Sequence, residues 1–195
     1  MTMALVAVCA HAALTAAQVL DRVSAALTKP ASVSVTFSFK GQGGSGNGSL
    51  TVCRDLFTYN AGDLAVWYDG KSQWALQRSA AEVSLTEPTA EELVESNPFR
   101  IITHYKRNYT YKLQPAPKGQ YKILLTAKSR SAAVRTAVVT VNACTFVPVS
   151  IEASMGAGAR TTVTVKSFVA GKALPKSYFQ FNPRLNKDVH VNDLR

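Results

Sequence analysis

The chain has 195 residues, of which 47% are hydrophobic and 17% charged, so it fits one folded domain and is not globally disordered. No apolar run reaches the ~20 residues that a membrane-spanning helix needs, and three Cys and three His are too few for a structural zinc module. The 22 Lys and Arg against 12 Asp and Glu give a net charge of +10, but they are spread among strand-like segments, which argues against a nucleic-acid-binding site.

The start of the chain is typical of an export signal. Residues 4–10 are apolar, and the sequence AHA at residues 10–12 has the small-x-small form of a signal-peptidase site. The first three residues carry no charged side chain, so the basic start of such a signal is missing. We predict a signal peptide, truncated at its start, over residues 1–12, and a single domain over residues 13–195. An apolar first helical turn is the alternative.

In an exported protein, two cysteines of the mature chain would lie in an oxidising compartment. Cys53 and Cys144 fall in separate strand-like segments. A disulfide requires their Cα atoms to lie within ~7 Å of each other. The sequence therefore leaves open whether they form a disulfide or remain two separate buried thiols.

The mature chain begins with a predicted helix and a predicted strand. Apolar residues recur at helical spacing over Leu14–Leu27, and Pro30 ends this helix. Val33–Phe39 alternates strictly between apolar and polar residues, which predicts a half-buried strand. The glycine-rich stretch Gly41–Gly48 predicts a flexible hairpin loop, because no Lys-Ser/Thr follows to mark a phosphate-binding loop. Further strands are predicted at Ser49–Arg54, Leu56–Asn60, Leu64–Tyr68, Gln73–Gln77, Glu82–Thr86, Tyr109–Gln114, Gln120–Ala127, Ala133–Val141, Phe146–Ala153, Thr161–Phe168, Tyr178–Asn182 and Val189–Asn192.

Two short helices interrupt this run of strands. Thr89 followed by Glu92 is a capping-box pattern, and Asn97 before Pro98 is an N-cap followed by a first-turn proline. The second of these helices has an apolar side that includes Phe99. Strands with one apolar face need other elements to cover that face, and these helices are the candidates.

The pattern therefore predicts a mainly β (α+β) fold: an incomplete β-barrel formed by one curved antiparallel sheet. The N-terminal helix and the two short helices would cover its concave apolar face. A sheet too large for three helices to fill would leave an apolar cavity for a ligand; a fully packed core is the alternative. The residues expected to line this cavity are Val33, Val35, Phe37, Phe39, Leu50, Val52, Phe57, Trp74, Phe99, Ile101 and Ile102.

One arginine departs from the apolar pattern. Arg54 shares the parity of Leu50 and Val52, so it would point to the helix-covered face. Its donors could bond the orphaned carbonyls of a helix end and hold a helical lid closed. The alternatives are a purely structural buried arginine, or a strand that ends at Cys53.

No catalytic or metal-binding constellation is present in the sequence. His11, His104 and His190 have no partnered nucleophile motif, and no metal-ligand cluster is found. Trp67 and Trp74, with the tyrosine beside Trp67, could stack sugars in a hydrolase or glycan binder, but packing within their hairpin explains them better. We predict a protein that is not an enzyme and needs no cofactor.

Five segments, in this order, resemble the LolA-type periplasmic lipoprotein carrier family. They are the N-terminal helix leading into VSVTFSF, the strand GNGSLTVCRDLFTYN, the hairpin WYDGKSQW, the helix SNPFRII, and YFQFN followed by VHVNDLR. The resemblance covers residues 14–195 and implies an incomplete β-barrel with a helical lid over an apolar cavity. Arg54 matches the family arginine that bonds the lid backbone and controls its opening; Asp55 departs from the proline that often follows it.

The resemblance also implies a role in the periplasm. Such a carrier accepts triacylated lipoproteins from an ATP-driven exporter in the inner membrane and delivers them to an outer-membrane acceptor, acting as a monomer without nucleic acid. The alternative is a periplasmic sensor or regulator of the same fold that binds lipids or misplaced lipoproteins.

Overall fold

A computed structural model describes residues 14–42, 44–90, 92–97 and 99–195. The predicted signal peptide lies outside these residues. The strands are β1 (Ser32–Gly41), β2 (Gly44–Cys53), β3 (Leu56–Ala61), β4 (Leu64–Tyr68), β5 (Gln73–Gln77), β6 (Glu82–Thr86), β7 (Tyr109–Gln114), β8 (Gln120–Ala127), β9 (Val134–Asn142), β10 (Pro148–Met155), β11 (Arg160–Gly171) and β12 (His190–Asp193). The helices are α1 (Ala16–Thr28), α2 (Glu92–Ser96), α3 (Arg100–Thr103) and α4 (Tyr105–Asn108), with short 3₁₀ turns η1 (Gly156–Gly158), η2 (Lys176–Phe179) and η3 (Pro183–Leu185).

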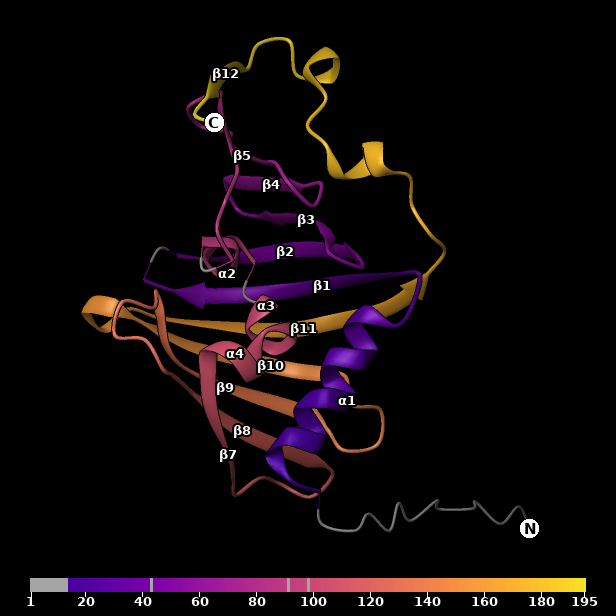
Figure 1. Ribbon diagram of the computed structural model, residues 1–195, viewed down its shortest axis with the longest axis vertical. Coiled ribbons are helices and arrows are strands. Elements are labelled where there is room, and N and C mark those ends of the chain that lie inside the picture. Colours follow the sequence, from indigo (N-terminus) through magenta and orange to yellow (C-terminus); the bar gives the residue numbers. More distant parts are fainter. Residues whose placement is uncertain (1–13, 43, 91, 98) are drawn as a thin grey trace.

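The strands form one open, curved sheet in the order β12-β6-β5-β4-β3-β2-β1-β11-β10-β9-β8-β7. Neighbours pair antiparallel, except that β12 runs parallel to β6. Because β12 and β7 lie at opposite edges, the sheet does not close, which confirms the predicted incomplete barrel. Figure 1 shows all four α-helices on the same side of the sheet. None of the described helices is long and apolar enough to cross a membrane.

The N-terminal helix forms where the sequence predicts it. Thr15 and Gln18 make a reciprocal capping box, in which the Thr15 side chain accepts from the Gln18 backbone (3.2 Å) and the Gln18 side chain accepts from the Thr15 backbone (2.9 Å). Its apolar residues Val19, Leu20 and Val23 are fully buried. This helix is therefore fixed at its start by the cap and along its length by the concave face of the sheet.

The glycine-rich stretch differs from the loop that its composition predicts. β1 and β2 continue until Gly41 pairs with Gly44, so most of the glycines lie in strand β2. A Cβ on Gly48 would overlap the ring of Phe37 and approach the carbonyl of Asn60 to 2.5 Å. Glycine is used here because it lets an aromatic ring lie directly on the neighbouring strand.

The C-terminal segment also differs from the prediction. The predicted strand Tyr178–Asn182 is wrong, because the segment forms η2 and then crosses the face of β3–β6 that is turned away from the helices. Phe181 packs edge-on against Trp67, with ring centroids 5.6 Å apart. Trp74 packs with Phe181 and Trp67 on this same face, because its position on β5 turns its side chain away from the helices. Its predicted place on the concave face is therefore wrong.

Cys53 and Cys144 are not joined by a disulfide. Cys53 ends β2, whereas Cys144 follows β9, and three strands, β1, β11 and β10, lie between β2 and β9. Adjacent strands are about 4.8 Å apart, so this separation exceeds the reach of a disulfide.

Candidate functional site

The concave face of the sheet and the helices α2–α4, here called the lid, meet through large apolar side chains. Phe37 of β1 stacks on Tyr59 of β3 (5.6 Å between ring centroids) and lies 5.9 Å from the ring of Phe99. Ile101 and Ile102 of α3 are fully buried in the same core. The lid side chains therefore fill the space that the sheet alone would leave open.

This core contains nearly all of the side chains that the sequence predicts at a ligand cavity. Except for Trp74, which lies on the opposite face, they are buried in the concave core or packed against it: Val33, Val35, Phe37, Phe39, Leu50, Val52, Phe57, Phe99, Ile101 and Ile102. In this structure they contact one another directly, as in the packed-core alternative.

Polar bonds tie the lid to α1. The Tyr105 hydroxyl donates to Asp21 Oδ1 (2.9 Å) and lies 3.1 Å from the carbonyl of Ala17. Lys106 Nζ forms an ion pair with the same Asp21 oxygen at 2.7 Å. The hydrogen bonds from Lys106 and Tyr105 lower the pKa of Asp21, so the tie persists when the solution becomes mildly acidic.

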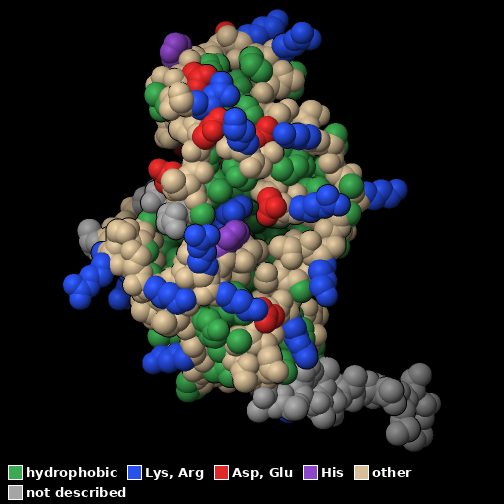
Figure 2. All heavy atoms as spheres, viewed as in Figure 1, with side chains coloured by type: hydrophobic (Ala, Val, Ile, Leu, Met, Phe, Trp, Pro, Cys, Tyr) green, Lys and Arg blue, Asp and Glu red, His purple; other side chains and the backbone are tan. Residues whose placement is uncertain are grey.

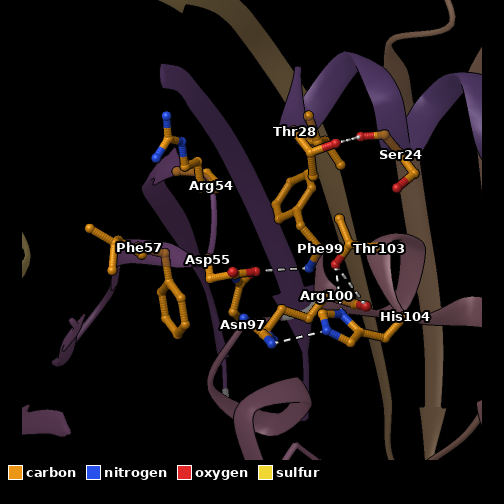
Figure 3. A pocket seen from close by; sticks show the side chains of 13 residues that line it. Ser24, Thr28, Arg54, Asp55, Phe57, Asn97, Phe99, Arg100, Thr103 and His104 are labelled. Carbon is orange, nitrogen blue, oxygen red and sulfur yellow. Dashed lines mark hydrogen bonds between the residues drawn. The ribbon is translucent and has the colours of Figure 1, made fainter. Parts of the chain in front are cut away.

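A small cavity of about 170 Å³ remains where the C-terminal end of α1, the β2–β3 turn and α3 meet. Figure 3 shows its polar side chains, among them Arg100 and His104 of the lid and Asp55 of the turn. Sites for drug-sized ligands occupy roughly 300–1,000 Å³, so this cavity is too small for an acyl chain while the lid is closed.

Arg100 is the unusual side chain of this cavity. One guanidinium nitrogen, Nη2, lies 3.1 Å from His104 Nε2, and the group lies 5.9 Å from the ring centroid of Tyr68. Its Nε is buried and has no hydrogen-bond partner among the described residues. Burial lowers the pKa of Arg100, which expresses the cost of holding this cation partly out of water.

The surroundings of His104 favour its neutral form. Its Nδ1 lies 2.9 Å from the Thr103 hydroxyl, which in turn donates to the Arg100 carbonyl (3.3 Å). Since that hydroxyl proton is used, we infer that Nδ1 carries the ring proton and Nε2 accepts from Arg100. Burial, and then the charge of Arg100, lower the pKa of His104.

This lowered pKa predicts a pH-dependent stability. Folded His104 binds its proton less tightly than unfolded His104, whose pKa is about 6.5. Protonation therefore favours the unfolded chain, and the free energy of unfolding should fall as the pH drops through 6.5 towards the lowered value. Urea unfolding across this pH range checks it: His104→Gln should lose this part of the pH dependence, and the exposed His190→Gln should keep it. A slope unchanged in His104→Gln would contradict the assignment.

Arg54 does not adopt the orientation that its parity predicts. β2 ends at Cys53, and Arg54 occupies the β2–β3 turn with a left-handed φ of 56°. Its side chain is exposed, forms no hydrogen bond with the described residues, and points away from Arg100 and His104 (Figure 3). It lies at the mouth of the small cavity but does not bond the lid.

Removing the Arg54 side chain should therefore have little effect. Asn tolerates a left-handed φ, so Arg54→Asn should change the free energy of unfolding by less than about 0.5 kcal/mol. Hydrogen exchange of the lid amides should also be unchanged. Faster exchange in this variant would show that Arg54 does hold the lid.

Sequence reasoning missed the role of Arg100. The sequence did contain an indication of it: Arg100 and His104 are four residues apart in a predicted helix, which places their side chains on one face. The tie between Tyr105 and Asp21 joins residues 84 positions apart, so no local pattern could have indicated it. Among the described residues, no group of three or more His, Cys, Asp or Glu is placed to hold a metal ion.

The sequence over residues 6–157 matches the family model described as outer membrane lipoprotein carrier protein LolA. A search of curated proteins found no significant match.

The chain was also compared with solved structures. The chain resembles an uncharacterised conserved protein from Thermus thermophilus (13% identity, TM-score 0.61, 91% of this chain and 98% of that chain covered). It also matches a LolA superfamily protein from Nitrosomonas europaea (12% identity, TM-score 0.44, 87% of this chain and 99% of that chain covered). A third match is a chain of the Pseudomonas aeruginosa MucA/MucB complex (11% identity, TM-score 0.43, 85% of this chain and 60% of that chain covered). The first of these likenesses shows that the two chains share a fold.

Proposed function

Because the chain belongs to the outer membrane lipoprotein carrier protein LolA family, we propose that it binds the acyl chains of lipoproteins beneath its lid and carries them through the periplasm. Membership of this family supports a lipid- or lipoprotein-binding role. The donor would be an ATP-driven exporter in the inner membrane, and the acceptor would lie at the outer membrane.

The observation that carries this proposal is the contact between the lid and the concave face. Phe99, Ile101 and Ile102 of the lid bury their side chains against β1–β3 of an open sheet. If the lid moves out, the same strand side chains can contact acyl chains in place of lid side chains. The buried apolar surface is then exchanged rather than lost, so opening in the presence of lipid costs little.

The energies fit a carrier that must both hold and release its cargo. Each buried acyl CH₂ contributes about 0.8 kcal/mol, so triacyl chains would not leave a membrane for water unaided. The lid is tied to α1 through bonds such as that of Tyr105 with Asp21, and a hydrogen bond to a charged group contributes only about 1.5–3 kcal/mol. Cargo binding can therefore outweigh the ties, and no covalent step is needed. The protein would act as a monomeric binding protein, not as an enzyme.

A release assay tests the proposed function. The purified chain is added to energised spheroplasts of its host, and the supernatant is assayed for newly made triacylated lipoprotein bound to it. We expect a soluble one-to-one complex. Absence of release by a correctly folded chain would contradict a carrier role and favour the sensor alternative.

A pair of variants controls this assay. Ile102 is fully buried in the lid, whereas Leu185 in η3 is 81% exposed on the far side of the sheet. Ile102→Asp should abolish lipoprotein release, because a charge cannot share an apolar site with acyl chains. Leu185→Asp should leave it unchanged. Circular dichroism must show that both variants are folded, and equal release by the two would contradict the proposed binding face.

A further inference from the structure

The net positive charge of the protein comes from one half of the molecule. From residue 99 to residue 171 the chain contains eleven Lys and Arg and a single acidic residue, Glu152. The net charge of this segment therefore equals the +10 of the whole chain. In the fold, the segment forms α3, α4 and strands β7–β11, which are contiguous and reach one edge of the sheet. We call this the basic half.

The figures show the same asymmetry on the surface. In Figure 2 blue side chains are distributed over the lower half of the visible face, where red is rare, whereas both colours mix in the upper half. The ion pair of Lys106 with Asp21 neutralises one of the eleven cations. The basic half therefore presents a broad positive field rather than a charge focused on one pocket.

Part of this charge lies beside the lid. Lys128 of the β8–β9 turn donates to the carbonyls of Lys106 and Arg107 at the end of α4 (2.9 and 3.2 Å), which holds the turn against the lid. A cavity of about 230 Å³ opens here. Its rim includes Arg107, Lys128 and Ser129, and Glu92 also lines it; its apolar lining includes Val94, Tyr109 and Val134. Basic side chains and hydroxyls around an apolar lining suit the head and first methylenes of an anionic lipid.

The edge of the basic half also combines basic and apolar side chains. β7 is the last strand of the described sheet, and its Tyr111 and Leu113 are 37% and 41% exposed on either side of Lys112. An exposed aromatic and an exposed aliphatic side chain next to a cation are typical of protein surfaces that sit in the headgroup region of a bilayer.

We propose that the basic half docks on the surface of an anionic lipid bilayer, with the lid corner at Arg107 and Lys128 facing the headgroups. Docking would place the lid against the membrane, so that acyl chains pass between bilayer and carrier without crossing water. That consequence rests on the proposed function; the docking itself does not. An acidic protein would also be attracted, but dispersed charge beside exposed Tyr111 and Leu113 matches a laterally uniform, amphiphilic surface better than a defined partner.

Vesicle co-sedimentation of the full chain tests the inference. We expect binding to vesicles of phosphatidylcholine mixed with phosphatidylglycerol, no binding to phosphatidylcholine alone, and loss of binding at high salt. The triple variant Lys112→Gln, Arg107→Gln, Arg130→Gln should weaken partitioning roughly 100-fold, since each basic residue near the surface contributes about fivefold. The triple variant Lys40→Gln, Arg184→Gln, Lys187→Gln removes the same charge from exposed sites outside the basic half and should bind as the parent does.

Three outcomes would overturn the docking surface. They are equal binding to both vesicle types, equal weakening by the two triple variants, or no vesicle binding combined with salt-sensitive retention on polyglutamate, which would indicate an acidic protein partner. A fluorescent fatty acid titrated without vesicles separates this inference from the proposed function. Probe binding without vesicle docking would refute the inference alone, and docking without probe binding would count against the carrier.

Discussion

Phe37→Ala should lower the free energy of unfolding by about 3–5 kcal/mol, which is the usual cost of deleting a buried phenylalanine. Phe37 is almost fully buried and links the sheet to the lid, because its ring contacts both Tyr59 of β3 and Phe99 before α3. Gly48 leaves its backbone open beneath this ring, so no neighbouring side chain can fill the space. Urea unfolding of parent and variant measures the loss directly.

Phe39 provides the matched control, because it lies on the same strand and the same face but is only partly buried. Phe39→Ala should therefore cost less than half as much. Hydrogen exchange adds a second readout: amides of α3 should exchange faster in Phe37→Ala, since Phe99 loses its ring partner, and should be little changed in Phe39→Ala. Equal losses and equal exchange in the two variants would show that the Phe37–Phe99 contact does not hold the lid.

Most strands were predictable because their signals are local. Five strands, β4 to β8, have the predicted bounds, and the turn between β4 and β5 contains Gly70 at a φ of 96°. Alternation in β1 correctly places Val33, Val35 and Phe37 on one buried face. The open sheet with covering helices then follows from the need to bury that face.

The errors arose where distant segments decide the outcome. β5 carries apolar residues on both faces, so the side on which Trp74 is covered depends on Phe181, which arrives more than a hundred residues later. Arg54 was placed by extending the alternation of β2 one residue beyond its end at Cys53. A turn residue with a left-handed φ does not follow strand parity, and the sequence contains no glycine there to mark the turn.

The structure therefore points to Arg100 of the lid, and not to Arg54, as the charged side chain that affects lid opening. Arg54 of the β2–β3 turn makes no hydrogen bond with the described residues of the lid, whereas Arg100 of α3 lines the small cavity with His104. A lid that carries its own partly buried cation is easier to open, because opening returns the guanidinium to water. The buried apolar contacts favour closure, and the incompletely satisfied Arg100 opposes it.

Arg100→Met should therefore stabilise the protein by about 1–3 kcal/mol, which is the usual cost of a buried polar group left without a hydrogen-bond partner. The methionine keeps the packing of the aliphatic stem and removes the unpartnered Nε. The closed lid would gain this free energy, so the open population should fall about tenfold for each 1.4 kcal/mol, and uptake of a fluorescent fatty acid should slow in proportion.

Two controls make this result specific. Arg184→Met removes the same charge from an exposed position in η3, away from the lid, and should change neither the free energy of unfolding nor the uptake rate by much. Arg100→Lys retains a buried cation and should not stabilise. If Arg100→Met instead destabilises the protein and accelerates uptake, then the contacts with Tyr68 and His104 outweigh the desolvation of the guanidinium, and Arg100 is a latch that holds the lid closed rather than a charge that promotes its opening.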